Sequence, residues 1–534
     1  MTVPAPGTVV VVGAGPVGQT AALLLARWGV RVVVLDPRPG RDLVGSKAIC
    51  QQRDVLDVWD AVGAGRTLAE EGVTWTTSRT FHRDVELFAQ TFADRGRSSF
   101  PPFVNVSQSR TEQVLDALLA DAPLVEVRWG HDVVGLEQDE DGVTVRCATP
   151  DGTRELRADH VLACPGARGD AVRAMLGLRF DDETFADQFL ICDIRAELPG
   201  WELERRFYFD PVWNPGRQVL IHACPDSTYR IDWQVPPGFD LAAETASGAL
   251  DERIRQVVGD RPYEVVWASS YRFSSRVVDR MRVGRVLVAG DAAHLVSPFG
   301  ARGLNSGVLD AENAAWKLAF VLHGWAGEEL LESYHVERHA AALENLAVTG
   351  ATMRFLVPGD EQQRRHRLEV LERARTDVAA RALVDSGRLA EPFWYVDSPL
   401  TLPDPSRPFA GRPPKGEVPE PGPGVLVPDC PVRVDGRPDV TRLRQLLREG
   451  VTMLVGRAVD AGALAPTGGP GAPVQVHHVQ DLRGEVDTML GMRPEEVWLV
   501  RPDAHVAAVL VAPSGEDVVA ALRRLLGQPT AVPV

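Results

Sequence analysis

The chain opens with two runs of branched apolar residues on either side of one helix-like segment. The runs are VVVVGAG and VRVVVLD, and PVGQTAALLLARWG between them carries apolar residues at helical spacing, with Gly29 as a natural helix stop. Apolar runs without polar alternation are typical of strands buried on both faces. The opening therefore predicts a parallel β-α-β unit.

The middle of the chain, from about residue 185 to 267, follows a different pattern. FLICDIRAEL, RRFYFDPVW, RQVLIHACP and TYRIDWQVP are short segments in which apolar and polar residues partly alternate, separated by turn-forming residues. This pattern predicts an antiparallel sheet with one face covered. A buried strand, GRVLVAGD, and a long helical region from Leu304 to about Phe355 come next.

A proline-rich passage from Asp397 to Gly424 cannot form regular helix or sheet and separates off the end of the chain. Beyond it, helix-like RLRQLLREG and DVVAALRRLLG enclose several strand-like segments. We therefore predict four parts, which are a discontinuous α/β domain (1–180 and 275–395), a sheet domain (75–105 and 181–274), a linker (396–424) and a small α/β domain (425–534).

Length and charge narrow the class of protein. A chain of 534 residues exceeds the size of one core, so several domains are expected. The net charge of -16 argues against nucleic acid as a partner, because phosphate would be repelled. No apolar run reaches the roughly 18 residues of a membrane span. We expect a cytoplasmic protein with no membrane partner.

The cysteines give no sign of metal or redox chemistry. Six are scattered along the chain without a CxxC pair: Cys50, Cys147, Cys164, Cys192, Cys224 and Cys430. Such spacing supports neither a zinc site nor a disulfide-exchange site. We expect no metal, and thiols that are reduced and mostly buried.

The first strand leads into a glycine turn of the kind that binds dinucleotides. Gly13, Gly15 and Gly18 form G-A-G-P-V-G, followed directly by a helix whose positive end can face a pyrophosphate. Asp36 ends the second strand, where a carboxylate can accept hydrogen bonds from a ribose. The turn alone does not separate NAD from FAD.

A second motif, GDAAHLVSPFGARGLNSG, follows the later buried strand. Gly300 and Gly303 allow the backbone to lie against a flat ligand, and Asn305 is expected to cap a helix that begins near Leu304. A helix start at this place would stabilise negative charge on a reduced flavin. Asp291 can accept a hydrogen bond from the ribityl chain. The motif therefore favours FAD.

With both motifs, and with DAENAAWKL after them, residues 8–400 resemble the class A flavoprotein aromatic hydroxylases. The resemblance implies an α/β + β fold with a Rossmann-like FAD-binding domain and an antiparallel-sheet substrate domain. The last domain resembles the thioredoxin-like C-terminal domain of larger members, here without CxxC, with a packing or dimerisation role. A homodimer is possible on this basis.

The same resemblance implies the cofactor contacts. Gly13, Gly15, Gly18 and Asp36 would hold the ADP half of FAD. Lys47 stands where the family usually has arginine, and Gln108 matches a glutamine that contacts the FAD chain, although it also suits a surface position before a helix. Further matches to flavin and ribityl contacts are Asp291, Pro298, Gly303, Leu304 and Asn305.

Members of this family reduce FAD with NADPH or NADH, and a flavin C4a-hydroperoxide then hydroxylates an aromatic ring. A phenolic or polyketide-like substrate and O2 are therefore expected. His222 is a candidate base or relay for a phenol, with a buried structural histidine as the alternative. Substrate-pocket candidates are Tyr208, Trp213, His222, Trp233 and Pro298, and core packing is the alternative for each aromatic residue.

Two other functions stay open. One is an FAD-dependent oxidase, or an oxidative-rearrangement or Baeyer–Villiger enzyme, with weakened NAD(P)H use. The other is a non-enzymatic flavin-fold protein, against which the intact GDAAH loop argues. The turn LACPGARGD bears on the alternative with weakened NAD(P)H use, because the family usually has an aspartate where this chain has Pro165. Proline keeps a turn but offers no carboxylate, so we expect slower or substrate-gated reduction by NAD(P)H.

Overall fold

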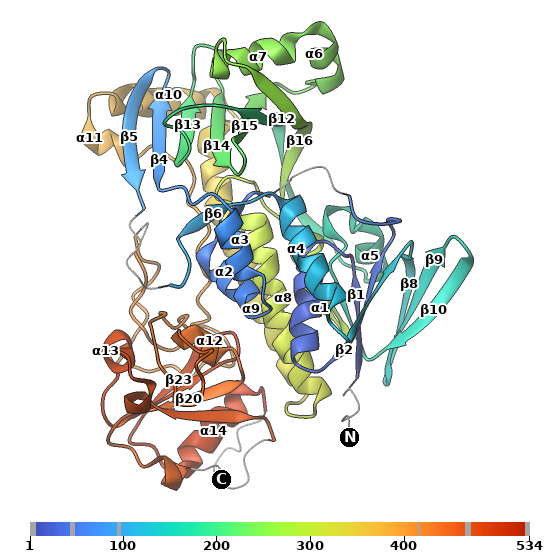
Figure 1. Cartoon of the computed structure of the whole chain (residues 1–534), viewed down its shortest axis with the longest axis vertical. Helices are drawn as coiled ribbons and strands as arrows, with labels where there is room; N and C mark the ends of the chain where they lie inside the picture. Colours follow the sequence, from blue (N-terminus) through green and yellow to red (C-terminus); the bar gives the residue numbers. More distant parts are fainter. Residues whose placement is uncertain (1–6, 43–47, 93–97, 415–416, 465–470, 529–534) are drawn as a thin grey trace.

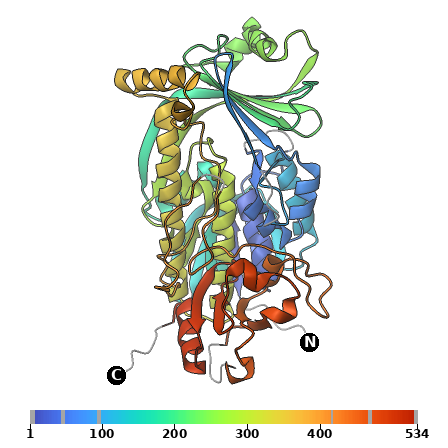
Figure 2. The same ribbon diagram turned by 90° about the vertical axis from the view of Figure 1, so that its left-hand side faces the viewer.

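The computed structural model describes residues 7–42, 48–92, 98–414, 417–464 and 471–528. Figures 1 and 2 show an elongated molecule with three parts along its length. A large sheet occupies one end, a central part is built around two long helices, and the C-terminal part occupies the other end.

The predicted parallel β-α-β unit is confirmed in the central part. There β1 (Thr8–Val12) pairs in parallel with β2 (Arg31–Asp36), and α1 (Pro16–Arg27) connects them. The apolar residues of both strands are buried, as the unbroken runs predicted. The sheet has the order β17-β18-β11-β1-β2-β7, and its other strands are β7 (Val125–Trp129), β11 (His160–Ala163), β17 (Arg282–Val283) and β18 (Val286–Val288).

Two helices occupy the predicted helical region, α8 (Arg302–Leu322) and α9 (Glu329–Leu356). Helix α8 packs between α1 and α9 (Figure 1). The other elements of the central part are α2 (Arg53–Asp60), α3 (Gly65–Glu71), α4 (Gln108–Ala120), α5 (Asp170–Met175), the strand pair β3 (Cys50–Gln52) and β6 (Phe103–Asn105), and the small sheet of β8 (Asp132–Asp139), β9 (Gly142–Thr149) and β10 (Gly152–Ala158).

The sheet at the end of the molecule has eight strands in the order β19-β16-β12-β15-β14-β13-β4-β5. The predicted antiparallel pairing is confirmed within the middle segment, while β13 and β4 pair in parallel. The strands are β4 (Thr77–His82), β5 (Val85–Thr91), β12 (Phe180–Ala196), β13 (Glu204–Phe209), β14 (Gln218–Cys224), β15 (Thr228–Val235), β16 (Tyr263–Val278) and β19 (His294–Leu295). The helices around it are α6 (Leu241–Ser247), α7 (Ala249–Val258), α10 (Glu361–Ala374) and α11 (Val378–Arg381).

The two faces of this sheet have different neighbours. On one face Trp233 and Ile221 form a core with Ile254 of α7. On the other, Phe207 packs 6.1 Å from the ring of Phe299, which lies just before α8. Only the second face, called the inner face below, is therefore turned toward the central part.

The C-terminal part is a four-stranded sheet of order β21-β20-β22-β23 with three short helices. Its elements are β20 (Val451–Val455), β21 (Val474–His478), β22 (Glu496–Val500), β23 (Val506–Val511), α12 (Leu443–Leu447), α13 (Val486–Leu490) and α14 (Gly515–Leu525). As predicted, the described residues of the proline-rich passage form neither helix nor strand, but they pack closely, with Ser398, Leu400 and Thr401 buried.

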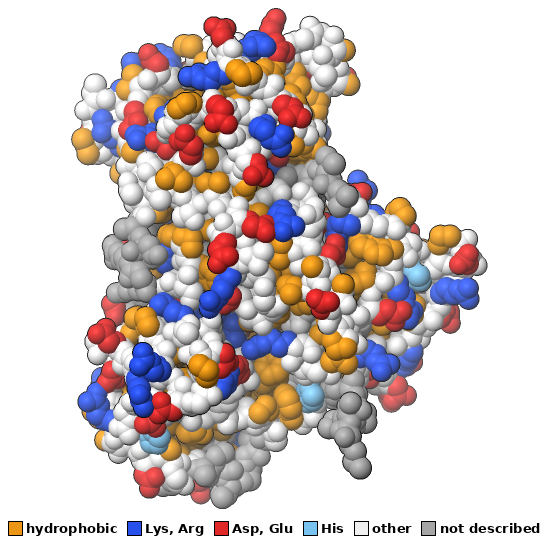
Figure 3. Space-filling model, in the orientation of Figure 1, with side chains coloured by type: hydrophobic (Ala, Val, Ile, Leu, Met, Phe, Trp, Pro, Cys, Tyr) orange, Lys and Arg blue, Asp and Glu red, His pale blue; other side chains and the backbone are white. Residues whose placement is uncertain are grey.

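Charged side chains of both signs are interspersed over the face that Figure 3 displays. All six cysteines are free, and five are buried while Cys224 is half-buried, which confirms the sequence prediction. Among the helices of the described ranges, none combines the length and apolarity needed to cross a membrane. The same ranges hold no cluster of three or more histidine, cysteine or acidic side chains suited to a metal ion.

Candidate cofactor and substrate site

Of the three glycines in the dinucleotide turn, two are packed against the backbone and one borders open space. A methyl group at Gly13 would lie 2.3 Å from the carbonyl oxygen of Cys164, and one at Gly18 would lie 2.0 Å from the carbonyl oxygen of Gly13. Gly13 also has a φ of +101°, which favours glycine. At Gly15 the same methyl group would meet nothing within 4 Å. Two glycines thus fix the turn, and the third leaves space beside the start of α1.

Asp36 lies at the end of β2 against this turn. Its carboxylate accepts hydrogen bonds from the Ala14 N–H at 2.8 Å and from the Arg38 guanidinium at 2.9 Å. Burial raises the pKa of Asp36, but the hydrogen bonds from Arg38 and the backbone outweigh it and hold the pKa below its usual value. Asp36 is therefore ionised at neutral pH, beside the open side of the turn.

The second sequence motif and the loop that contains Pro165 both pack against the glycine turn and the start of α1. Cys164 and Pro165 lie against Gly13, and Gly307 of α8 approaches Val17 of α1 and the Cα of Gly290. Pro165 itself has a φ of -69° and precedes the short 3-10 helix Gly166–Arg168. Three segments that are far apart in the sequence thus lie together around the glycine turn.

A buried ionic cluster holds the GDAAH loop in position. The Asp310 carboxylate of α8 accepts from the Gly290 N–H at 2.9 Å and contacts His294 Nε2 at 2.6 Å. Arg338 of α9 donates to the same carboxylate at 2.7 Å. Burial raises the pKa of Asp310, but His294 and Arg338 outweigh it and bring the pKa to about 2. Asp291, next to Gly290, is half-buried.

The start of α8 differs from the expectation for Asn305. The helix begins at Arg302, after Ala301 in a left-handed conformation, so Asn305 lies inside the first turns and does not cap them. Its side-chain amide instead joins α8 to β3, accepting from the Gln52 N–H and donating to the carbonyl of Cys50, both at 2.9 Å. No described side chain caps the first N–H groups of α8, and a methyl group at Gly303 would make only an ordinary contact, 3.8 Å from Val296.

The remaining predicted cofactor residues lie nearby or outside the described ranges. Gln108 begins α4 and accepts from the Ala48 N–H at 3.2 Å, so it is not a free surface residue. Lys47 lies outside the described residues. Leu304, at the start of α8, is half-buried and packs against the core of the central part. Pro298, which precedes α8, is exposed.

These features fit the dinucleotide cofactor. Space beside Gly15, an ionised carboxylate at the strand end and two helix starts without side-chain caps are what a dinucleotide needs. Gln51, on β3 beside the Asn305 bridge, is fully buried, and its amide finds no partner among the described residues. A buried amide without a partner is costly, which suggests that a ligand supplies one.

His222 lies on the inner face of the large sheet, opposite Arg205 on β13 and Arg230 on β15. Burial and the two arginines lower its pKa well below the usual value, so the ring is neutral at pH 7. Arg230 is paired with Asp193 through two bonds of 2.7 and 2.8 Å. The neutral imidazole of His222 can therefore either donate or accept a hydrogen bond, and it does so between two positively charged arginines.

Arg205 was not predicted and is the most unusual side chain of this face. It is 4% exposed, yet with the residues that the structure describes its guanidinium makes only two hydrogen bonds of 3.3 Å, to Ser78 Oγ and the carbonyl of Ser386. Its Nε has no partner among the described residues. Burial lowers its pKa to about 10, so it stays charged at neutral pH. Asp232 acts on Arg205 electrostatically, but no carboxylate of the described residues forms an ion pair with it, and a buried cation without such a pair indicates a site for an anion.

Asp232 lies two residues beyond Arg230 and so on the same face. Burial raises its pKa to about 7, with Arg230 acting in the opposite direction and Asp193 adding to the rise. Its Oδ1 has no partner among the described residues. In TYRIDWQV, charged residues alternate with buried apolar ones, and this alternation was the signal that could have found both Arg230 and Asp232.

Three of the predicted pocket residues lie on the face of the sheet opposite to His222. Trp233 is fully buried in the core under α7, and Tyr208 and Trp213 pack against that core. Tyr208 also stacks on Phe81 with ring centroids 4.6 Å apart. Because neighbouring residues of a strand face opposite sides, Trp233 cannot share the face of Asp232. In this structure the three aromatics thus contribute to the core under α7.

Comparison with known proteins agrees with this geometry. The sequence matches the family of the FAD binding domain over residues 7–349, and the family of the aromatic-ring hydroxylase C-terminal domain over residues 420–529. It is 32% identical to para-nitrophenol 4-monooxygenase of Pseudomonas sp. (strain WBC-3), over 70% of this chain and 92% of the relative. It is 35% identical to rifampicin monooxygenase of Streptomyces venezuelae, over 68% and 75%.

A solved structure extends the likeness of the fold to nearly the whole chain. The flavin-dependent monooxygenase PieE, in complex with FAD and substrate, superposes with a TM-score of 0.86 at 23% identity, over 98% of this chain and 99% of the other. The uncapped helix starts and the open glycine turn thus belong to a fold that binds FAD. The chain is a member of the FAD-dependent aromatic-ring hydroxylases, which are flavoprotein monooxygenases.

Proposed function

We propose that this enzyme uses NADPH or NADH and O2 to hydroxylate an aromatic substrate that presents an anionic or ionisable oxygen to the inner face of the large sheet. The observation that carries the proposal is Arg205, a buried cation with no carboxylate partner among the described residues. Two relatives act, by name, on para-nitrophenol and rifampicin. FAD supplies the oxygen-transfer chemistry when it is bound.

In this proposal each polar group of the inner face has one task. Arg205 binds the substrate oxygen and stabilises its negative charge. Asp232 accepts the proton that leaves a phenol, because its pKa of about 7 matches neutral pH. His222 orients the hydroxyl as a neutral hydrogen-bond partner. An ionised phenol is more electron-rich, so removal of its proton favours hydroxylation of the ring.

A pH profile tests the role of Asp232. Because the carboxylate is the active form, kcat/KM of the native enzyme is expected to rise with pH through about pH 7. Asp232→Asn should lose this rise and be about tenfold slower at pH 8. His222→Gln is the matched control and should keep the rise, since the ring is neutral throughout. An unchanged profile in Asp232→Asn would exclude the carboxylate as the proton acceptor.

The reaction itself is tested on purified enzyme loaded with FAD. Anaerobic mixing with NADPH should bleach the flavin, and a panel of mono- and polycyclic phenols should accelerate the bleaching. Mass spectrometry after admission of O2 should then find a product heavier by one oxygen atom. If NADPH does not bleach the flavin with any phenol of the panel, the oxidase alternative is favoured.

Pro165 is the observation that favours weak use of NAD(P)H. The backbone at this position, with a φ of -69°, accepts other residues, so Pro165→Asp should fold normally. We expect it to speed anaerobic flavin reduction by NADPH about threefold to tenfold, since it restores the carboxylate that the family uses. Pro165→Ala, which changes the ring but adds no acid, is the control. Equal rates in all three proteins would refute a role of this residue in reduction.

We further infer that Gly13, Gly15, Gly18 and Asp36 hold the ADP half of FAD, with Lys47 and Gln108 along its chain. Asp291, Gly303, Leu304 and Asn305 would lie at the ribityl chain and flavin, with Pro298 between flavin and substrate. The domain boundaries given above serve as the proposed division of the chain. A thioredoxin-like class for the last domain is supported by its sheet, in which β20 pairs in parallel with β21 and antiparallel with β22.

A further inference from the structure

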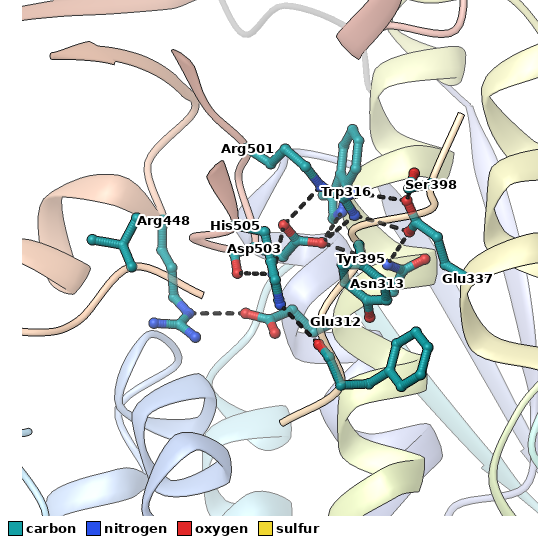
Figure 4. Close-up of polar contacts among 12 residues, drawn as sticks. Glu312, Asn313, Trp316, Glu337, Tyr395, Ser398, Arg448, Arg501, Asp503 and His505 are labelled. Atoms are coloured by element: carbon teal, nitrogen blue, oxygen red, sulfur yellow. Dashed lines mark hydrogen bonds and ion pairs between the residues drawn. The ribbon is translucent and has the colours of Figure 1, made fainter. Parts of the chain in front are cut away.

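A buried polar cluster joins the C-terminal part to the central part (Figure 4). Its centre is Glu337 of α9, which is 2% exposed. Two nitrogens of Arg501, from the C-terminal part, donate to its carboxylate at 2.6 and 2.9 Å. Lys317 Nζ of α8 donates at 2.6 Å, and the hydroxyl of Ser398 at 2.5 Å. Residues from α8, α9, the proline-rich passage and the C-terminal part thus share one carboxylate.

Asp503 completes the cluster from the C-terminal side. It accepts from Arg501 at 2.6 Å and from the indole of Trp316 at 3.2 Å. Burial raises the pKa of Glu337, but Arg501 and Lys317 outweigh it and bring the pKa to about 2. The charges of Glu337, Asp503, Arg501 and Lys317 sum to zero, so the cluster is neutral as well as buried.

Tyr395 connects this cluster to the cofactor side of the central part. Its ring lies under the Arg501 guanidinium at 4.7 Å and beside the His505 ring at 4.4 Å. Its hydroxyl accepts a hydrogen bond from Arg338 at 3.0 Å. Arg338 is 1% exposed and donates at 2.7 Å to Asp310, the residue that holds the Gly290 N–H.

We propose that the C-terminal part positions the GDAAH loop of the FAD site through Tyr395, Arg338 and Asp310. The path runs from Arg501 and His505 to the Tyr395 ring, through Arg338 to Asp310, and ends at Gly290 beside Asp291. Tyr395 is thus a positioning residue for the cofactor rather than a catalytic one. This proposal rests on the placement of the FAD chain at Asp291 under the proposed function.

The physical basis is that Arg338 has few ways to satisfy its donors. It is buried, and its guanidinium is shared among Tyr395, Asp310 and Ser306. Loss of one acceptor leaves a charged donor without a protein partner at a site that is almost fully buried, so the guanidinium must shift. Because Asp310 binds both Arg338 and the loop backbone, a shift of one displaces the other.

The test removes the hydroxyl oxygen of Tyr395, which lies in the middle of the path from Arg501 to Gly290. Tyr395→Phe keeps the ring between Arg501 and His505 but removes the acceptor of Arg338. We expect the Kd for FAD to rise about threefold to tenfold, the scale of coupling through packed networks, with a changed reduction potential of the bound flavin. Ser398→Ala is the control, because it removes one hydrogen bond from Glu337 without touching Arg338.

Thermal unfolding of the apoproteins separates positioning from loss of stability. If Tyr395→Phe and Ser398→Ala lower Tm equally and only Tyr395→Phe changes FAD affinity and potential, the proposal stands. If both variants bind FAD as the native protein does, it is overturned. Asp291→Ala is measured in parallel, since an unchanged FAD affinity in that variant would instead refute the placement of the FAD chain under the proposed function.

Discussion

Gly15→Ala is expected to leave the protein folded and to weaken FAD binding by about a hundredfold or more. The added methyl group meets no protein atom within 4 Å and the backbone has a φ of -77°, which alanine accepts. The methyl group instead occupies the space in which the pyrophosphate would approach the backbone. Without that approach, the first N–H groups of α1 cannot bind the phosphate.

Two measurements distinguish a loss of FAD affinity from a loss of protein stability in Gly15→Ala. Titration of the apoprotein with FAD should show the loss of affinity, and thermal unfolding of the same apoprotein should show an unchanged Tm. Gly18→Ala is the contrasting variant, because its methyl group would lie 2.0 Å from the carbonyl oxygen of Gly13 and should destabilise the apoprotein itself. Native FAD affinity in Gly15→Ala would disprove the assignment of this turn to the cofactor.

The second large effect is expected for Arg205→Met, in which stability and substrate binding should change in opposite directions. A buried guanidinium with two long hydrogen bonds is costly in the free enzyme, so methionine of similar length should keep the Tm or raise it. The anionic oxygen of the substrate, in contrast, would lose its charged partner. Such a loss costs about 2 kcal/mol or more, so KM should rise about 30-fold or more.

Arg205→Lys is the matched variant for this prediction. It keeps the charge but loses the planar arrangement of donors, so its KM should lie between those of the native enzyme and Arg205→Met. Steady-state kinetics with a phenol found in the anaerobic screen gives KM, and unfolding of the apoprotein gives Tm. A native KM in Arg205→Met would show that the substrate anion binds elsewhere.

Much of the fold could be predicted because it depends on local patterns. The unbroken run before Gly13 and the run ending at Asp36 gave a buried parallel pair, and the structure has it as β1 and β2. Glycines mark positions where the backbone itself requires them, as Gly13 does with its positive φ. The start of α8 was harder to predict, since Ala301 takes a left-handed conformation that sequence seldom signals.

The substrate site could be predicted only in part. Alternation along a strand separates two faces but does not say which face is turned toward the cofactor. For that reason the aromatic residues Tyr208, Trp213 and Trp233 were plausible ligand contacts by sequence, whereas the packing of α7 places them in a core. His222 was found because it is a histidine in an apolar strand, while Arg205 resembled one more surface arginine.

By itself the sequence determined the order of elements, the dinucleotide turn, the second flavin motif and the family, because each depends on residues close together in the chain. Only the tertiary structure decided the identity of the inner face and the partners of its charges. It also decided the role of Tyr395 and of Ser398 in the proline-rich passage after it, because these residues contact α9 and the C-terminal part. Residues more than a hundred positions apart share one buried carboxylate there, and no local pattern encodes such a meeting.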